Sequence, residues 1–273
     1  MKIGVFDSGY GGLTILKEIR AKLPEYNYIY LGDNARNPYG TRSFEIVYQF
    51  TLEAVKTLFE KGCNLVILAC NTASAKALRS IQQNDLPKID PSKRVLGVIR
   101  PTVELLPQVS KTGHIGILAT PGTVKSLSYS IELHKINAEM KITEHACPMW
   151  VPIVENNEIA SPGADFFIQR ETETLMKIDP EIDTVVLGCT HYPLMAHKIK
   201  RYLPENVNIL CQGEIVANSL ADYLIRHPEI ERKIGKNREI NYFTTEHTEK
   251  FDSLASLFLG HPIESEIISI KEK

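Results

Sequence analysis

The chain has 273 residues, which is enough for one large domain or two modest ones. Its 31 basic and 33 acidic residues give a formal net charge of -2, so it lacks the electrostatic signature of a protein that binds nucleic acid or an anionic membrane. No apolar run approaches the roughly 18 residues that cross a bilayer, and residues 1–6 lack the basic and apolar segments of a secretory signal. We therefore expect a cytoplasmic protein.

Strand-like and helix-like segments alternate along the first third of the chain. The predicted strands cover 2–6, 28–31, 65–69 and 94–99, and the predicted helices cover 13–23, 43–61 and 72–83. Ser43 is the expected N-cap of the long second helix, and Gly62 is its expected stop. This order predicts parallel strands covered by helices, with ligands bound beyond the carboxyl ends of the strands. After residue 206 we expect strands at 207–211 and 240–244 and helices at 214–226 and 246–259.

The two parts of the chain resemble each other. Residues 3–8 are echoed by residues 115–120, and the apolar run before Cys70 is echoed, at nearly the same offset, by the run before Cys189. We interpret this as an α/β fold of two similar doubly wound domains with mainly parallel sheets. A pseudo-two-fold axis between the domains would place the active site in the cleft that separates them. Chance similarity between buried strands is the alternative.

The cysteines indicate free thiols. Their number is odd, and no C-x-x-C or dense Cys/His spacing occurs, so disulfide scaffolds, thioredoxin-type exchange and structural zinc are disfavoured; the five are Cys63, Cys70, Cys147, Cys189 and Cys211. Cys70 and Cys189 each end an apolar run and precede small polar residues that begin a helix. A helix N-terminus favours the thiolate, so we expect lowered thiol pKa values there.

Two such thiols suit proton transfer at a carbon atom. One thiolate would remove the hydrogen of a stereocentre, and the opposite thiol would return one from the other side. Because the reverse reaction swaps these roles, both positions need the same group. Each thiol could instead be an inert buried side chain, or one could be a nucleophile and the other a spectator. We expect neither a metal nor a cofactor.

Other polar residues follow strands. Asp7 and Ser8 could orient an ammonium group or tune a thiol, or could merely cap a turn. An aspartyl phosphatase also begins with a strand and an aspartate, but the second aspartate expected two residues on is replaced by Gly9. The loop 32–41 is either a ligand lid or an ordinary connection. His191 beside Cys189 could activate that thiol, whereas Glu155 could simply be a solvated helix end.

Five ordered motifs carry a family resemblance from Ile3 to about Leu220. They are Phe6-Asp7-Ser8-Gly9-x-Gly11-Gly12, Gly32-Asp33 with Pro38-Tyr39-Gly40, Ala69-Cys70-Asn71-Thr72-Ala73, Ala119-Thr120-x-Gly122-Thr123 and Gly188-Cys189-Thr190-His191-Tyr192-Pro193. On these motifs the chain resembles the cofactor-independent glutamate racemases of bacteria, in the aspartate/glutamate racemase superfamily.

The resemblance implies an isomerase that interconverts L- and D-glutamate and supplies the D-isomer for peptidoglycan, usually as a homodimer. It implies a discontinuous first domain, 1–95 with 208–273, and a second domain, 96–207. It also implies Cys70 and Cys189 as the two bases, assisted by Asp7 and His191, which also contact the substrate, and less securely by Asp33 and Glu155. The implied substrate-binding residues are Ser8, Pro38, Tyr39, Gly40, Asn71, Thr72, Thr120, Thr123 and Thr190.

Some positions depart from the expected family pattern. Asn34 and Asn37 vary the loop before Pro38, and Arg100 places a positive charge in the crossover between the predicted domains. Three alternatives to a glutamate racemase stay open. They are an aspartate racemase, a noncatalytic binding protein that keeps the racemase fold, and a phosphatase or thiol transferase.

Overall fold

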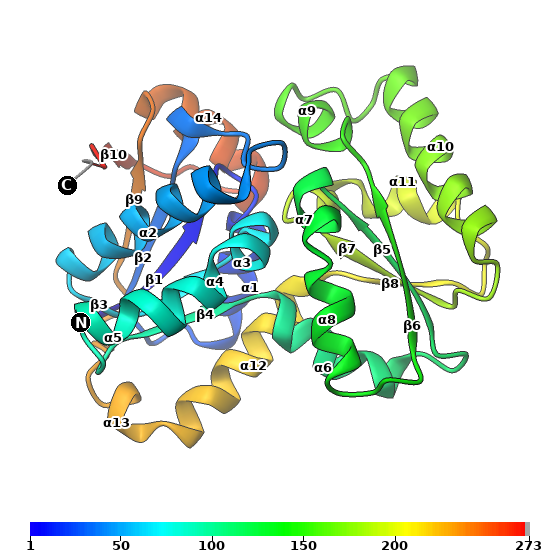
Figure 1. Ribbon diagram of the computed structural model, residues 1–273. Coiled ribbons are helices and arrows are strands. Elements are labelled where there is room, and N and C mark those ends of the chain that lie inside the picture. Colours follow the sequence, from blue (N-terminus) through cyan, green and yellow to red (C-terminus); the bar gives the residue numbers. More distant parts are fainter. Residues whose placement is uncertain (271–273) are drawn as a thin grey trace.

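The computed structural model describes residues 1–270 and shows two β-sheets in separate lobes (Figure 1). Every strand pairing described in them is parallel. The first sheet has the order β10-β9-β2-β1-β3-β4. Its strands are β1 (Lys2–Asp7), β2 (Tyr28–Gly32), β3 (Cys63–Leu68), β4 (Arg94–Gly97), β9 (Ile240–Thr244) and β10 (Ser265–Ile267).

The second sheet repeats the central order of the first. Its order is β6-β5-β7-β8, which matches β2-β1-β3-β4 strand for strand. The strands are β5 (His114–Ala119), β6 (Lys141–Ala146), β7 (Thr184–Gly188) and β8 (Asn208–Leu210). This shared topology confirms the predicted α/β fold of two similar halves with parallel sheets. It also makes β3 and β7, the strands that lead into Cys70 and Cys189, equivalent to each other.

Helices cover both sheets and join the two lobes. Those before β5 are α1 (Leu13–Lys22), α2 (Phe44–Glu60), α3 (Asn71–Lys76), α4 (Leu78–Ser80), α5 (Leu86–Ile89) and α6 (Ile99–Val109), with a 3-10 turn η1 (Asn34–Arg36) and a π-helical turn η2 (Ile81–Asp85). Those after β5 are α7 (Pro121–Ser126), α8 (Ser128–His134), α9 (Trp150–Glu155), α10 (Pro162–Ile178), η3 (Tyr192–Met195), α11 (Ala196–Arg201), α12 (Gln212–Arg226), α13 (Pro228–Glu231) and α14 (Thr248–Leu259). No helix within 1–270 is long and apolar enough to span a bilayer.

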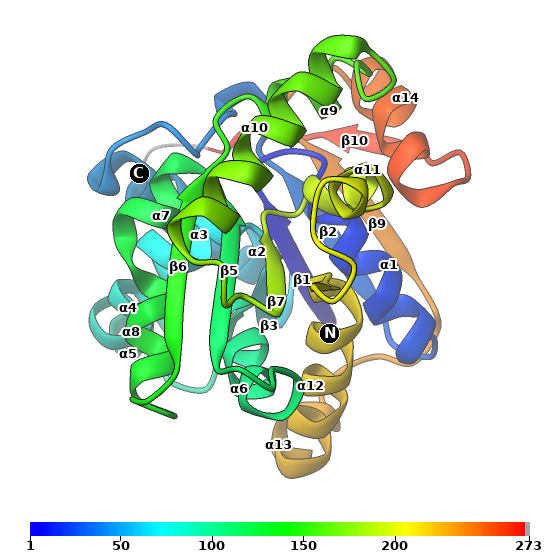
Figure 2. The ribbon, with the colours of Figure 1, turned by 90° about the vertical axis from the view of Figure 1, so that its right-hand side faces the viewer.

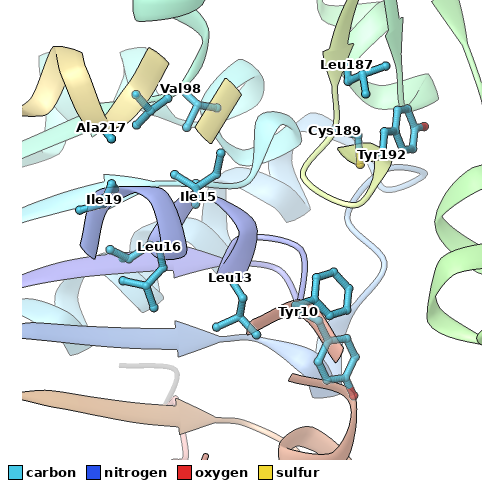
Figure 3. Close-up of a cluster of buried hydrophobic side chains, with 14 of the residues drawn as sticks. Tyr10, Leu13, Ile15, Leu16, Ile19, Val98, Leu187, Cys189, Tyr192 and Ala217 are labelled. Carbon is cyan, nitrogen blue, oxygen red and sulfur yellow. The ribbon is translucent and has the colours of Figure 1, made fainter. Parts of the chain in front are cut away.

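The chain passes between the lobes at α6 and again at α12, which lie near their junction (Figure 1). The apolar face of α1 packs on α12, and Figure 3 shows Ile15 and Ile19 close to Ala217 of α12. The same buried cluster includes Cys189 of the second lobe. One continuous core therefore connects the packing of α1 to the turn that bears the second thiol.

Most predicted elements are confirmed, and Ser43 caps α2 by accepting a hydrogen bond from the Ile46 amide. Two predictions are wrong in detail. The helix predicted over 72–83 changes its winding after Ala77 and continues through η2 to Ile89. The strand predicted over 94–99 ends at Gly97, because the Val98 amide donates to the Ser74 side chain instead of continuing the ladder.

Sheet membership places two segments differently from the expected domain boundaries. The expected first domain ends at residue 95, but β4 pairs in the first sheet as far as Gly97. The expected first domain also includes 208–273, but β8 pairs with β7 in the second sheet. We propose a first domain of about residues 1–97 that resumes after Leu210. Residues 271–273 of that assignment lie outside the described part of the chain.

Candidate active site

The two thiols open into one cavity. Cys70 follows β3 and is the N-cap residue of α3, and Cys189 follows β7 just before η3. Each is only 6% exposed, and both line the same cavity of about 280 Å³. That volume suits a ligand smaller than the drug-sized molecules that fill typical binding pockets.

The structure brings together nearly all of the residues predicted for the site. The predicted residues that line the cavity are Ser8, Pro38, Tyr39, Gly40, Cys70, Asn71, Thr72, Thr120, Glu155, Cys189, Thr190 and His191. The other three, Asp7, Asp33 and Thr123, are fully buried behind it. Within residues 1–270, no group of three or more His, Cys, Asp or Glu side chains could hold a metal ion.

Asp7 links the loop that follows β1 to the turn that carries Cys189. Its Oδ2 accepts a hydrogen bond from the Gly9 amide at 2.9 Å, and its Oδ1 accepts one from the Thr190 hydroxyl at 3.4 Å. Burial raises the pKa of this carboxyl, although the charge on His191 and backbone amides oppose the rise. Asp7 therefore joins the first lobe to the Cys189 turn from beneath the cavity.

Asp33 supports a loop of the cavity and does not face the ligand space. Its carboxylate accepts hydrogen bonds from the Tyr39 hydroxyl at 2.5 Å, from Arg36 Nε at 2.7 Å and from the Thr245 hydroxyl at 3.0 Å. These bonds fix the Tyr39 ring beneath the cavity-lining Pro38 and Gly40. The geometry gives Asp33 the position of a structural support.

A cluster of hydroxyl groups lies where the lobes meet. The Thr72 hydroxyl is 2.9 Å from that of Thr120 and 3.4 Å from that of Thr123. Thr120 also caps α7, accepting from the Thr123 amide. Thr72 comes from the first lobe and the other two from the second. The distances between these hydroxyls therefore depend on how closely the lobes approach.

The Asn71 side chain is engaged behind the cavity. Its Nδ2 donates to Gln212 Oε1 at 2.7 Å, and its Oδ1 accepts from the Tyr129 hydroxyl at 2.7 Å. Gln212 in turn donates to the Thr102 hydroxyl at 2.8 Å. These groups come from α3, α8, α12 and α6. The buried network therefore ties the start of α3, beside Cys70, to α6 and α12, the two helices at which the chain passes between the lobes.

The two thiols sit in different electrostatic surroundings. The prediction that the helix start lowers the thiol pKa is wrong for Cys70. Burial and the charge of Asp7 raise the pKa of Cys70 to about 12, outweighing the hydroxyl of Ser8 and the amide of Ala73, which favour the thiolate. The helix start acts in the predicted direction, but desolvation of the charged form is the larger effect. Cys70 is therefore a thiol at neutral pH.

A histidine and a carboxylate stand behind the other thiol. His191 Nδ1 lies 3.9 Å from the Cys189 sulfur, and His191 Nε2 lies 3.0 Å from Glu155 Oε1. Burial opposes the charged imidazole, yet the hydrogen bonds to Cys189 and Glu155 raise the pKa of His191 to about 10. The pKa of Glu155 is lowered because hydrogen bonds from His191 and Asn37 outweigh its own burial. The charged imidazole of His191 therefore lies directly beside the Cys189 sulfur.

Sequence reasoning missed several residues of the cavity wall, including Asn37, Cys147, Val151 and Pro152. Cys147 directly follows β6, as Cys70 and Cys189 follow their strands, so its place in the chain was a usable signal. Asn37 stands next to the predicted Pro38, but only the fold shows what its amide contacts. The apolar residues of α9 gave no distinguishing signal.

Paired thiols at equivalent strand ends, in a cavity between two parallel-sheet lobes, define a class of enzymes that act on a small molecule with two matched acid–base groups. A sequence profile of the Asp/Glu/Hydantoin racemases matches residues 13–220. The chain is 39% identical to the glutamate racemase of Dinoroseobacter shibae over 274 aligned residues, covering 97% of both chains. The chain belongs to the Asp/Glu/Hydantoin racemase family, as its motifs predicted.

Solved structures agree with this assignment. Glutamate racemase isoform RacE1 from Bacillus anthracis superposes with a TM-score of 0.89 at 37% identity, covering 98% of this chain and 97% of that one. The glutamate racemase of Francisella tularensis, solved in complex with D-glutamate, superposes with a TM-score of 0.87 at 30% identity over the same shares of the two chains.

Gly11 permits the close contact between the Asp7 loop and the Cys189 turn. A Cβ atom at this position would lie 2.5 Å from His191 Nδ1 and nearer still to the Thr190 hydroxyl. We predict that Gly11→Ala displaces the His191 turn and lowers kcat/KM for the substrate by about a hundredfold, as misplacement near 1 Å does. Steady-state kinetics on the folded variant would measure this, and Gly163→Ala, in an open helix start, is the control. Unchanged kcat/KM in Gly11→Ala would contradict the packing described here.

The raised pKa of Cys70 gives a second prediction. With a pKa near 12, its thiol stays protonated from neutral pH to about pH 10. The ultraviolet absorbance of thiolate should therefore differ little between Cys189→Ser and the double variant Cys70→Ser/Cys189→Ser throughout that range. A titration step near the ordinary thiol pKa of about 8.5 in that difference would show that the helix start outweighs burial.

Proposed function

We propose that this chain is a glutamate racemase, in which Cys70 and Cys189 exchange protons with the α-carbon of glutamate from opposite sides. The observation that carries the proposal is the pair of buried thiols from equivalent strand ends that share one cavity of amino-acid size. The names of the relatives give the substrate. The family likeness extends over nearly the whole chain, so it includes both lobes that build the cavity.

The surroundings of the thiols suit the two halves of one proton exchange. In one direction of the reaction, Cys189 acts as the thiolate, takes the α-proton and becomes a thiol. The Cys70 thiol then gives its own proton to the opposite face and becomes a thiolate. The net result is inversion at carbon with one proton removed and one added. The reverse reaction begins with Cys70 as the thiolate and Cys189 as the thiol.

The carbanion formed between these steps needs stabilisation. Cys70 and Cys189 are largely buried, and fixed hydrogen-bond donors act more strongly at a buried site than in bulk solvent. The hydroxyls of Ser8, Thr72 and Thr190 and the backbone amides at the start of α3 are placed to bind the substrate carboxylates. His191, held on Glu155, compensates the charge on Cys189 when that sulfur is a thiolate.

We further propose the cellular role that the family implies, which is to supply D-glutamate for peptidoglycan in the cytoplasm, and a homodimer as the working form. Glutamate is favoured over aspartate because the relatives that are 37 to 39% identical over nearly the whole chain are named as glutamate racemases. Parallel assays with L-aspartate would distinguish these substrates.

Incubation of L-glutamate in deuterated water tests the chemistry. Wild type should produce D-glutamate with solvent deuterium at the α-carbon. Cys70→Ala and Cys189→Ala should each lose about a thousandfold or more of the racemisation rate, because each removes one acid–base group. Chiral chromatography with mass spectrometry measures both quantities.

The matched control is Cys211→Ala, which removes an exposed thiol outside the cavity and should keep the wild-type rate. Near-normal racemisation by either Cys70→Ala or Cys189→Ala would refute the two-base assignment. Fast racemisation without incorporation of deuterium would exclude solvent-exchangeable thiols as the bases.

A further inference from the structure

Asn37 brings the two lobes together at one carboxylate oxygen. It follows η1 in the first lobe, and its Nδ2 donates to Glu155 Oε1 at 2.8 Å. The same oxygen accepts from His191 Nε2 at 3.0 Å. Two donors from opposite sides of the cavity therefore converge on one atom of Glu155.

The Glu155 carboxylate has little else to fix its orientation. Glu155 is the last residue of α9, and its side chain is 21% exposed. In the described part of the chain, the side-chain hydrogen bonds of Glu155 are those with Asn37 and His191. Without the Asn37 amide, the carboxylate is free to rotate toward solvent and away from the imidazole.

We propose that Asn37 is a positioning residue that holds Glu155 against His191 and so fixes the imidazole beside Cys189. The idea rests on the proposed racemase function for its catalytic meaning, but its structural claim does not need that function.

Other charged groups face this assembly and act with Asn37. Asp7 of β1 lies close enough to His191 for their charges to interact, and Cys189 contacts the other ring nitrogen. Lys250 of α14 faces Glu155 and lowers its pKa, and Tyr10 also lies within the field of that carboxylate. Figures 1 and 2 both place α9 and α14 at the same end of the molecule. The Phe258 ring of α14 packs edge-on against the His191 ring. This contact covers the imidazole without placing a charge beside it.

Nuclear magnetic resonance titration of the His191 imidazole in Asn37→Leu tests the proposal directly. Leucine keeps the size of the side chain but has no donor for Glu155. The pKa of His191, about 10 in wild type, should fall by about one unit, the size expected when a hydrogen bond to a charged group is lost. At neutral pH the imidazole stays charged in both proteins, so kcat/KM for glutamate should change little there, whereas its fall at alkaline pH should begin about one pH unit lower.

Asn37→Asp is the matched variant, because it has the same shape and adds a negative charge near the imidazole. It should not lower the pKa of His191, since the ring keeps an anionic neighbour. In a Glu155→Gln background, Asn37→Leu should shift the His191 pKa by less than about a third of a unit, because coupled residues are not additive. This cycle separates an effect through Glu155 from a general change of packing.

Three results would overturn the proposal. They are an unchanged pKa of His191 in Asn37→Leu, an equal fall in Asn37→Leu and Asn37→Asp, and the same fall with Glu155→Gln present. The titration does not depend on turnover. If wild type did not racemise glutamate, the proposed function would fail while the titration would still decide the role of Asn37.

Discussion

Burial of two ionisable sulfurs in one small cavity is the constraint on which the rest of the site depends. A thiolate loses hydration when it is buried, so each sulfur needs either its proton or a nearby positive charge. Cys70 lies near the carboxylate of Asp7 and keeps its proton, as its raised pKa shows. Cys189 lies beside His191, whose raised pKa makes it a cation at neutral pH. The two sulfurs are equivalent in topology but have neighbours of opposite charge.

That difference fits a reaction between enantiomers. The two forms of an amino acid have equal free energy, and the enzyme must accept either one, with one sulfur protonated and the other not. The supports around the thiols do not repeat between the lobes, although the strands do. Asp7 and the Ser8 hydroxyl come from the first lobe, whereas the Glu155 and His191 pair belongs to the second. Strand topology supplies symmetry of position, and individual side chains give the two sulfurs different charged neighbours.

The sequence predicted those features that depend on short stretches of chain. Apolar runs located β1, β3, β5 and β7, and the polar residues after them located most of the cavity. Features set by contacts between distant segments were not predictable in this way. The raised pKa of Cys70 depends on burial and on Asp7, the engagement of Asn71 depends on Gln212 far along the chain, and the register of β8 depends on pairing with β7. Asn37 is an ordinary loop residue until the fold places Glu155 beside it.

The most direct test of the central claim is a crystal structure of the protein with glutamate bound. The account predicts that the sulfur atoms of Cys70 and Cys189 lie on opposite faces of the ligand's α-carbon, each within reach of its hydrogen. It also predicts that His191 remains on the Cys189 side with its ring held by Glu155. Both sulfurs on one face of the ligand, or a ligand bound away from either sulfur, would contradict it.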